Sequence, residues 1–86
     1  MMKNLVFERR LNVGGEYVVL SLFKTTRGFS LQRRLVERDQ AAFVQVLPIT
    51  AVDDLRRFAM ADPYSEVLAP LYYEVQRQLL EDGMIE

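Results

Sequence analysis

Hydrophobic and polar residues alternate along the first half of the chain in four runs, which are separated by short turn-forming segments. The runs cover residues 5–13, 16–24, 28–38 and 41–47. A period of two places every second side chain on the same face of a strand, and the β-branched and aromatic residues in the runs favour strands. Gly14–Gly15 is typical of a two-residue hairpin turn, a four-residue loop is expected at 25–28, and Asp39–Gln40 predicts another tight turn.

The second half of the chain changes to a helical period. Pro48 is expected to end the sheet, and apolar residues three and four positions apart then predict helices at about 51–61 and 66–82. Proline fits best in the first turn of a helix. Pro70 therefore predicts that the regular part of the second helix begins near Ala69.

The whole chain, residues 1–86, is expected to form a single domain of the α+β class. The predicted architecture is a four-stranded antiparallel meander sheet followed by two helices packed on one face, ββββαα. Turn lengths fix the strand register, so they predict Leu22 opposite Leu31 and Leu35 opposite Val44. The helix-covered face then collects Phe7, Leu11, Val13, Val18, Leu20, Leu22, Leu31, Leu35, Val44 and Val46.

Two arginines, Arg9 and Arg33, fall on this apolar face beside Leu20, where Arg33 would lie opposite Val46. A buried guanidinium group needs a carboxylate partner. The candidate partners on the helices are Asp53, Asp54 and Glu74. A β-bulge near Arg33 is a second solution, and a position at the sheet margin, where the long side chain reaches water, is a third. The margin is the favoured placement.

The opposite face of the predicted sheet is unusual because it combines aromatic rings, arginines and amides. An antiparallel sheet usually leaves one face polar and exposed to water. An uncovered face with this much apolar surface is typical of a binding site. The candidate partner-binding or nucleic-acid-binding residues are Arg10, Tyr17, Val19, Phe23, Gln32, Arg34, Arg38 and Phe43. Gln45 and Leu47 are expected on the same face.

Two functions fit this face. Tyrosine, phenylalanine and arginine are enriched at the centres of protein interfaces, which predicts a protein partner, either a regulatory target or a second copy in a homodimer. Alternatively, single-stranded DNA or RNA could stack its bases on Tyr17, Phe23 or Phe43 while arginines contact the phosphates. The protein partner is the favoured interpretation.

Charge is distributed unevenly along the chain. Residues 1–38 carry eight basic and three acidic side chains, whereas residues 39–86 carry three basic and nine acidic ones. A basic segment of this kind favours a polyanionic partner. The acidic pI of about 5.4 is evidence against a constitutive nucleic-acid binder, and the two halves could simply attract each other within the fold.

Catalysis and metal binding have little support, because the chain contains neither histidine nor cysteine. The usual general base, thiol nucleophile and zinc ligands are therefore missing, and we predict no enzyme, no metal and no cofactor. The absence of cysteine also favours a reducing compartment. The segment before Glu8 is too short in apolar residues for a signal peptide, and no run is long enough to span a bilayer. A soluble, cytoplasmic protein without membrane contact is expected.

Overall fold

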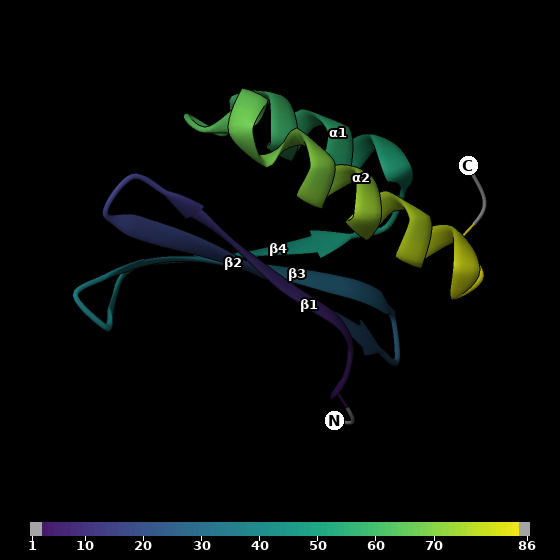
Figure 1. The fold of residues 1–86 in the computed structure, drawn as a ribbon. Coiled ribbons are helices and arrows are strands. Elements are labelled where there is room, and N and C mark those ends of the chain that lie inside the picture. The colour runs from purple at the N-terminus through teal and green to yellow at the C-terminus, as the bar shows by residue number, and fades with distance from the viewer. Residues whose placement is uncertain (1–2, 85–86) are drawn as a thin grey trace.

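The computed structural model describes the backbone of residues 3–84 and the side chains of residues 4–40 and 42–84. It contains, in order, β1 (Lys3–Val13), β2 (Glu16–Thr25), β3 (Gly28–Glu37), β4 (Gln40–Ile49), α1 (Val52–Ala61) and α2 (Ser65–Glu81). The strands form one antiparallel sheet in the order β1-β2-β3-β4, and both helices lie on the same face of it (Figure 1). The predicted ββββαα architecture is confirmed.

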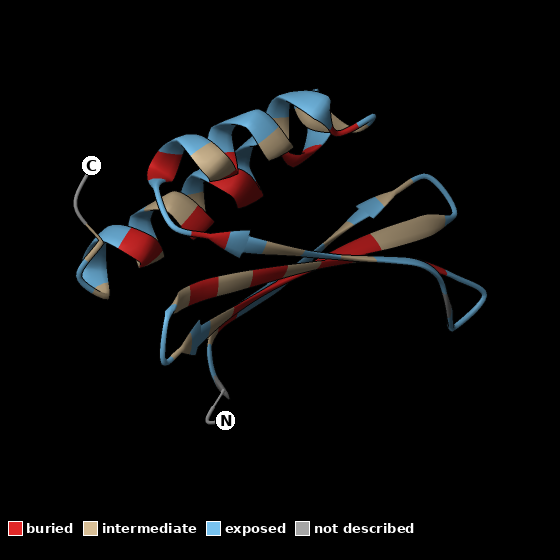
Figure 2. Cartoon of the chain, turned by 180° about the vertical axis from the view of Figure 1, so that it is seen from behind, coloured by how far each residue is buried: buried red, intermediate tan, exposed pale blue. Residues whose placement is uncertain are grey.

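The core lies between the sheet and the helical layer. Figure 2 shows buried positions on the sides of α1 and α2 that face the sheet and along the central strands. The fully buried apolar side chains at its centre are Val18, Leu20, Leu22, Leu31, Ile49, Leu68, Val75 and Leu79. Burying one such aliphatic side chain contributes about 1.5–3 kcal/mol to the free energy of folding. The apolar stripes of α1 and α2 therefore hold the two helices on this face of the sheet.

The register of the first three strands follows from their tight turns. Gly14, with a φ of 71°, and Gly15 connect β1 to β2. Leu22 lies opposite Leu31, as the sequence predicts, and the pairing of Arg9 with Leu20 is also confirmed. The connection between β2 and β3 contains two residues instead of the expected four, but it gives the same register.

The predicted register of β4 is wrong by one residue. Leu35 lies opposite Phe43 instead of Val44, and Arg33 lies opposite Gln45 instead of Val46. The turn lies one residue earlier than predicted, which alone would shift the pairing by two residues, and a β-bulge next to Leu35 leaves an extra residue in β4 and reduces the shift to one. A shift of one residue moves every side chain to the other face.

The shift therefore exchanges the two predicted sets of β4 side chains. Phe43, Gln45 and Leu47 lie on the helix-covered side, and the predicted core residues Val44 and Val46 lie on the uncovered face. Both valines are exposed, at 47% and 60%. The turn before β4 consists of Arg38 and Asp39, both with positive φ angles, rather than of residues 39 and 40.

Pro48 does not end the sheet. It pairs with Ser30 within β4, and the next residue, Ile49, is fully buried. Proline has no N–H group, so an edge strand accepts it only where that group would point away from the neighbouring strand. Residue 48 is such a position, and β4 can continue until Ile49 reaches the core.

Pro70 does not divide the second helix either. α2 runs without interruption from Ser65 to Glu81 with this proline inside it, so the expected start near Ala69 is wrong. Proline in a helix removes one backbone hydrogen bond and is unfavourable. Leu68 and Leu71 on either side of it are buried, and we attribute the continuous helix to their packing.

Candidate functional site: the uncovered face of the sheet

The uncovered face of the sheet carries most of the residues predicted to bind a partner. Arg10, Val19 and Arg34 lie side by side on β1, β2 and β3, because Arg10 pairs with Val19 and Val19 with Arg34. In the neighbouring rows, Tyr17 pairs with Val36 and Gln32 with Ser21, and Phe23 pairs with Ser30 further along. We call this surface the open face.

Two of the eight predicted binding residues, Phe43 and Arg38, lie elsewhere. Phe43 is on the helix-covered side of β4, opposite Leu35, and is 54% exposed there, so its predicted place on the open face is wrong. Gln45 and Leu47 lie on the same side as Phe43, which also contradicts the expectation. Arg38 is exposed in the turn between β3 and β4, at the end of the sheet.

The centre of the open face is buried although no described helix covers it. Val19 is 7% exposed, and Ser21 is completely buried. Long side chains from neighbouring strands fold over these small residues, as the contacts of Glu8 and Arg34 show. The Oε2 atom of Glu8 accepts hydrogen bonds from Ser21 Oγ at 2.6 Å and from Arg34 Nη2 at 3.3 Å.

Two arginines of the open face differ in how they are held. The guanidinium carbon of Arg10 lies 4.7 Å from the centroid of the Tyr17 ring, within cation–π distance. Arg34 is half-buried and bonded to Glu8, and its Nε atom has no hydrogen-bond partner among the described residues. The Tyr17 ring is thus partly covered by a cation before any ligand arrives.

A depression of about 300 Å³ lies in this part of the open face. Val19 and Val36 contribute apolar surface to its lining, and Glu8 contributes an acidic group. Its other lining residues include Arg10, Tyr17 and Arg34. Because arginines outnumber the single carboxylate, the depression suits a negatively charged or hydrogen-bond-accepting group of a partner.

A different arrangement occupies the helix-covered face around Arg33. Its Nε donates to Asp62 Oδ2 at 2.7 Å and its Nη2 donates to Asp62 Oδ1 at 2.8 Å. The two residues thus form a bidentate salt bridge. Asp62 also accepts hydrogen bonds from the Tyr72 hydroxyl at 2.6 Å and from the backbone N–H of Tyr64 at 2.9 Å. Every oxygen of this buried carboxylate is therefore paired twice.

The protonation of the cluster follows from these contacts. Burial alone would raise the pKa of Asp62, but the hydrogen bonds from Arg33, Tyr72 and Tyr64 and the charge of Arg33 outweigh it, so the pKa is lowered. Burial and the bond to Asp62 raise the pKa of Tyr72 well above its ordinary value. Asp62 is thus held ionised and Tyr72 is held protonated, which favours a structural role.

The expected position of Arg33 at the sheet margin is wrong, whereas Arg9 does lie at the margin. Arg33 is buried, but Arg9 is exposed, with its Nε 3.9 Å from Glu74 Oε1. Sequence reasoning missed Asp62 as the partner because Asp62 precedes Pro63, a position typical of a turn. No sequence signal identifies this pair, because the turn between α1 and α2 brings Asp62 to Arg33 only in the folded chain.

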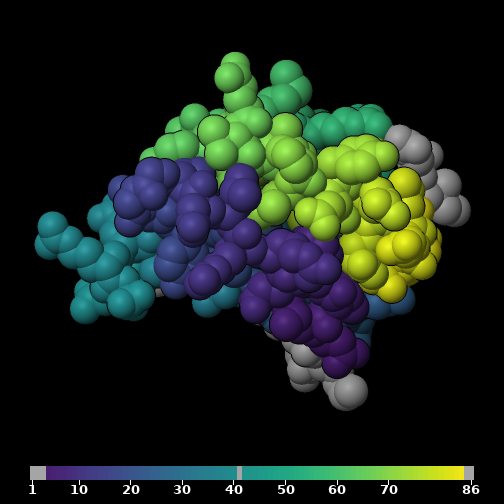
Figure 3. Space-filling view, viewed as in Figure 1, coloured from purple at the N-terminus to yellow at the C-terminus, as the bar shows by residue number. Residues whose placement is uncertain are grey.

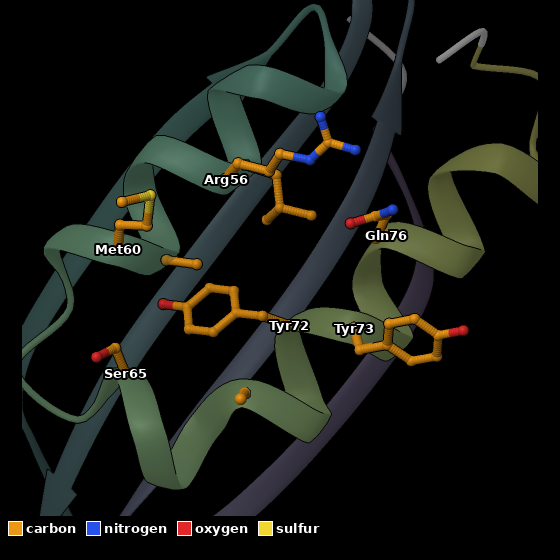
Figure 4. A pocket seen from close by; sticks show the side chains of 9 residues that line it. Arg56, Met60, Ser65, Tyr72, Tyr73 and Gln76 are labelled. Carbon is orange, nitrogen blue, oxygen red and sulfur yellow. The ribbon is translucent and has the colours of Figure 1, made fainter.

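A second concavity lies in the helical layer. A groove of about 560 Å³ runs between α1 and α2, with Met60 on one side and Tyr73 on the other, and Tyr72 lies between the two helices (Figure 4). Met60 and Tyr73 are both exposed. The groove is mainly apolar and contains no pair of groups suited to acid–base chemistry.

The acidic residues do not assemble into a metal site in the described part of the chain. No group of three or more acidic side chains converges there. Asp53 and Asp54 bond to Arg56 and Arg57, and Asp54 also accepts hydrogen bonds from the backbone N–H groups of residues 50 and 51. Within residues 3–84, none of the helices has the length and apolar character that a bilayer crossing requires.

Comparison with known proteins adds no functional information. No family model, curated protein sequence or solved structure matches the chain.

Proposed function

We propose that this chain is a small, non-enzymatic interaction module that binds a protein partner through its open face. The observation that carries the proposal is the pattern on that face. Exposed apolar side chains lie at both edges, Leu5 at 51% and Val46 at 60%, and the arginine-lined depression lies between β1 and β3. Apolar contacts around arginine and tyrosine are typical of protein interfaces.

The arginines of the depression favour a partner that presents a carboxylate or a backbone carbonyl. Arginine binds carboxylates with two parallel hydrogen bonds, and the valines beside it supply the apolar surroundings. A regulatory target and a second copy of this chain are both partners of this class. The proposed location is the cytoplasm, since the chain contains no cysteine.

Single-stranded nucleic acid is the second candidate, and the arginines around the depression are the observation in its favour. Its support is weaker than the sequence suggested, because stacking of bases needs accessible rings. Phe43 lies on the other side of the sheet, Tyr17 lies under the Arg10 guanidinium group, and Arg34 bonds to Glu8.

Affinity capture with a matched pair of charge reversals tests the proposal. Arg10→Glu changes the open face, whereas Arg27→Glu makes the same change of charge in the turn between β2 and β3. We expect proteins bound by the wild type to be retained by Arg27→Glu and lost by Arg10→Glu. Capture of the same proteins by Arg10→Glu would contradict the proposal.

Fluorescence anisotropy with labelled DNA and RNA oligonucleotides tests the second candidate with the same variants. If Arg10 binds a phosphate, Arg10→Glu should reduce the slope of log affinity against log salt by about 1. We expect no oligonucleotide binding at physiological salt. Tight, salt-dependent binding that Arg10→Glu abolishes would replace the protein partner with a nucleic acid.

A further inference from the structure

The two edge strands of the sheet are protected to very different degrees. β1 contains Glu8, Arg9 and Arg10, has a register shift between Leu5 and Phe7, and is flanked by α2 (Figure 3). Charged side chains and bulges are common means of preventing an edge strand from pairing with another chain. β1 therefore has the features of an edge strand that is protected against pairing with another chain.

β4 carries a bulge and a proline only near its two ends, and the segment 43–47 between them has neither a charge nor a bulge. No ionisable residue occurs between Asp39 and Asp53, and Phe43, Val44 and Val46 are all about half exposed or more. Figure 2 shows β4 along the near edge of the sheet, below the helices, with no other element in front of it. An uncharged, exposed edge strand is suited to adding a further strand.

The backbone groups available at this edge can be identified from Pro48. Residue 48 lies opposite Ser30, and proline cannot donate a hydrogen bond to β3. Backbone groups alternate in direction along an antiparallel strand. The N–H and C=O groups of Val44 and Val46 therefore point away from β3, as does the C=O group of Pro48.

The sequence of this strand is self-complementary about Gln45. Phe43-Val44-Gln45-Val46-Leu47 has equivalent residue types at equal distances from its centre. Two copies related by a twofold axis and paired antiparallel at Gln45 would place valine beside valine on the open face. On the helix-covered side, the same pairing would place Phe43 beside Leu47 of the second copy. Apolar cross-strand pairs of this kind stabilise a sheet.

We propose that two copies of this chain associate by antiparallel pairing of their β4 strands, centred on Gln45. Val44 and Val46 of each copy exchange four backbone hydrogen bonds with Val46 and Val44 of the other. Pro48, without an N–H group, ends the ladder on each side. No other twofold centre uses both valines without involving Pro48 or the bulge.

The resulting dimer has one continuous eight-stranded sheet. Because the twofold axis is perpendicular to the sheet, all four helices lie on one side and the two open faces lie together on the other. This inference goes beyond the proposed function, since it involves an edge of the sheet and leaves the depression at Arg10 and Arg34 accessible. The open face would be doubled, which increases the avidity of a partner with repeated contacts.

The mass in solution and a pair of matched variants test the interface. Light scattering should give twice the chain mass of 10.0 kDa at concentrations up to about 200 µM, a range chosen because small interfaces are weak. Val46→Lys introduces charges into the β4 edge and should return the mass to that of one chain. Leu5→Lys makes the same type of change on the open face of β1 and should leave the dimer intact. Circular dichroism confirms that both variants remain folded.

Cysteine crosslinking tests the register independently, because the natural chain contains no cysteine. In a non-hydrogen-bonded antiparallel pair, the two residues at position 45 are about 4.5 Å apart between Cα atoms, within the range of a disulfide. Gln45→Cys should therefore form a crosslinked dimer on oxidation. Phe43→Cys should not, since the two residues at position 43 are about 13 Å apart along the strands.

Three results would overturn this proposal. They are a single-chain mass over the whole concentration range, a dimer that survives Val46→Lys, and crosslinking of Phe43→Cys as readily as Gln45→Cys. A dimer disrupted by Arg10→Glu instead of Val46→Lys would indicate association through the open faces. Val46 also belongs to the open face, so the two proposals are separated with Phe43→Lys, which charges the β4 edge from the helix-covered side. Loss of the dimer in this variant with unchanged protein capture would leave the proposed function intact.

Discussion

Arg33 and Arg34 are consecutive residues of β3, and they show how different the two faces of the sheet are. Strand geometry directs their side chains to opposite faces. Arg33 is buried and forms a bidentate salt bridge with Asp62, whereas Arg34 is partly exposed and makes one 3.3 Å contact with Glu8. Asp62 fully neutralises the arginine on the helix-covered face, whereas Glu8 only partly neutralises the arginine on the open face.

The difference separates a group needed for folding from a group available for binding. Asp62 accepts hydrogen bonds from Arg33 of β3, from Tyr72 of α2 and from the backbone N–H of Tyr64. It therefore connects the sheet to α2 and to the turn between the two helices. Removing one member would leave a buried charge without a partner. The ion pair between Glu8 and Arg34 can break in favour of contacts with water or with a partner, and the loss of folding free energy is small.

The largest effect is expected for Asp62→Ala, which leaves the Arg33 guanidinium buried and uncompensated. Breaking a buried pair in this way costs about 3–5 kcal/mol. A domain of 86 residues has a total stability of about 4–13 kcal/mol, so the variant should be partly or wholly unfolded. Urea denaturation measures the loss of the free energy of unfolding.

The double variant Asp62→Ala/Arg33→Met provides the control. It removes both charges, so it should recover part of the stability that the single variant loses. A loss below about 1 kcal/mol for Asp62→Ala would mean that the pair resembles an exposed salt bridge, and the contrast between the two faces would disappear.

The comparison also shows what the sequence can predict. Short turns of known length determine register, and so Leu22 opposite Leu31 and the pairing of Arg34 with Val19 were predictable from the chain alone. The alternating pattern also placed Arg33 on the helix-covered face. Its partner was not predictable, since ionic contacts between distant segments depend on the path of the connection between the helices.

The register of β4 was not predictable for a related reason. A β-bulge adds one residue to a strand without a strong sequence signal. Valine at positions 44 and 46 and phenylalanine at 43 are all compatible with either face, so alternation alone favours neither register. The buried Ile49 decides it, because the strand has to pass Pro48 to bring this side chain into the core.

A smaller effect is expected for Tyr72→Phe, which removes a hydrogen bond to the ionised Asp62. Hydrogen bonds to charged groups contribute about 1.5–3 kcal/mol. The lowered pKa of Asp62 adds a pH dependence. A carboxyl group whose pKa is lowered by folding contributes stability above about pH 4, and this contribution is lost as the pH falls through the folded-state pKa.

The stability difference between the wild type and Tyr72→Phe should therefore be largest above about pH 5 and should shrink below about pH 4. Urea denaturation at several pH values measures it. Tyr73→Phe is the matched control, since Tyr73 is the next residue of α2 and its side chain is 63% exposed. A loss for Tyr72→Phe at neutral pH no larger than that for Tyr73→Phe would show that the hydrogen bond to Asp62 does not stabilise the fold.

The smallest effect is expected on the open face, for Glu8→Gln. The side chains of Arg34 and Glu8 are 34% and 46% exposed, and ion pairs with this exposure contribute less than about 1 kcal/mol. The buried Ser21 hydroxyl keeps an acceptor, because the amide oxygen of glutamine can replace the carboxylate oxygen. Urea denaturation at low salt should therefore show a small loss, which about 0.5 M salt should remove by screening.

A loss as large as that of Asp62→Ala would mean that the Glu8 cluster stabilises the fold as the Asp62 cluster does. With the small loss expected, Arg34 can give up Glu8 for a group of the partner, and Glu8→Gln should then strengthen the binding of an acidic partner by removing a competing carboxylate.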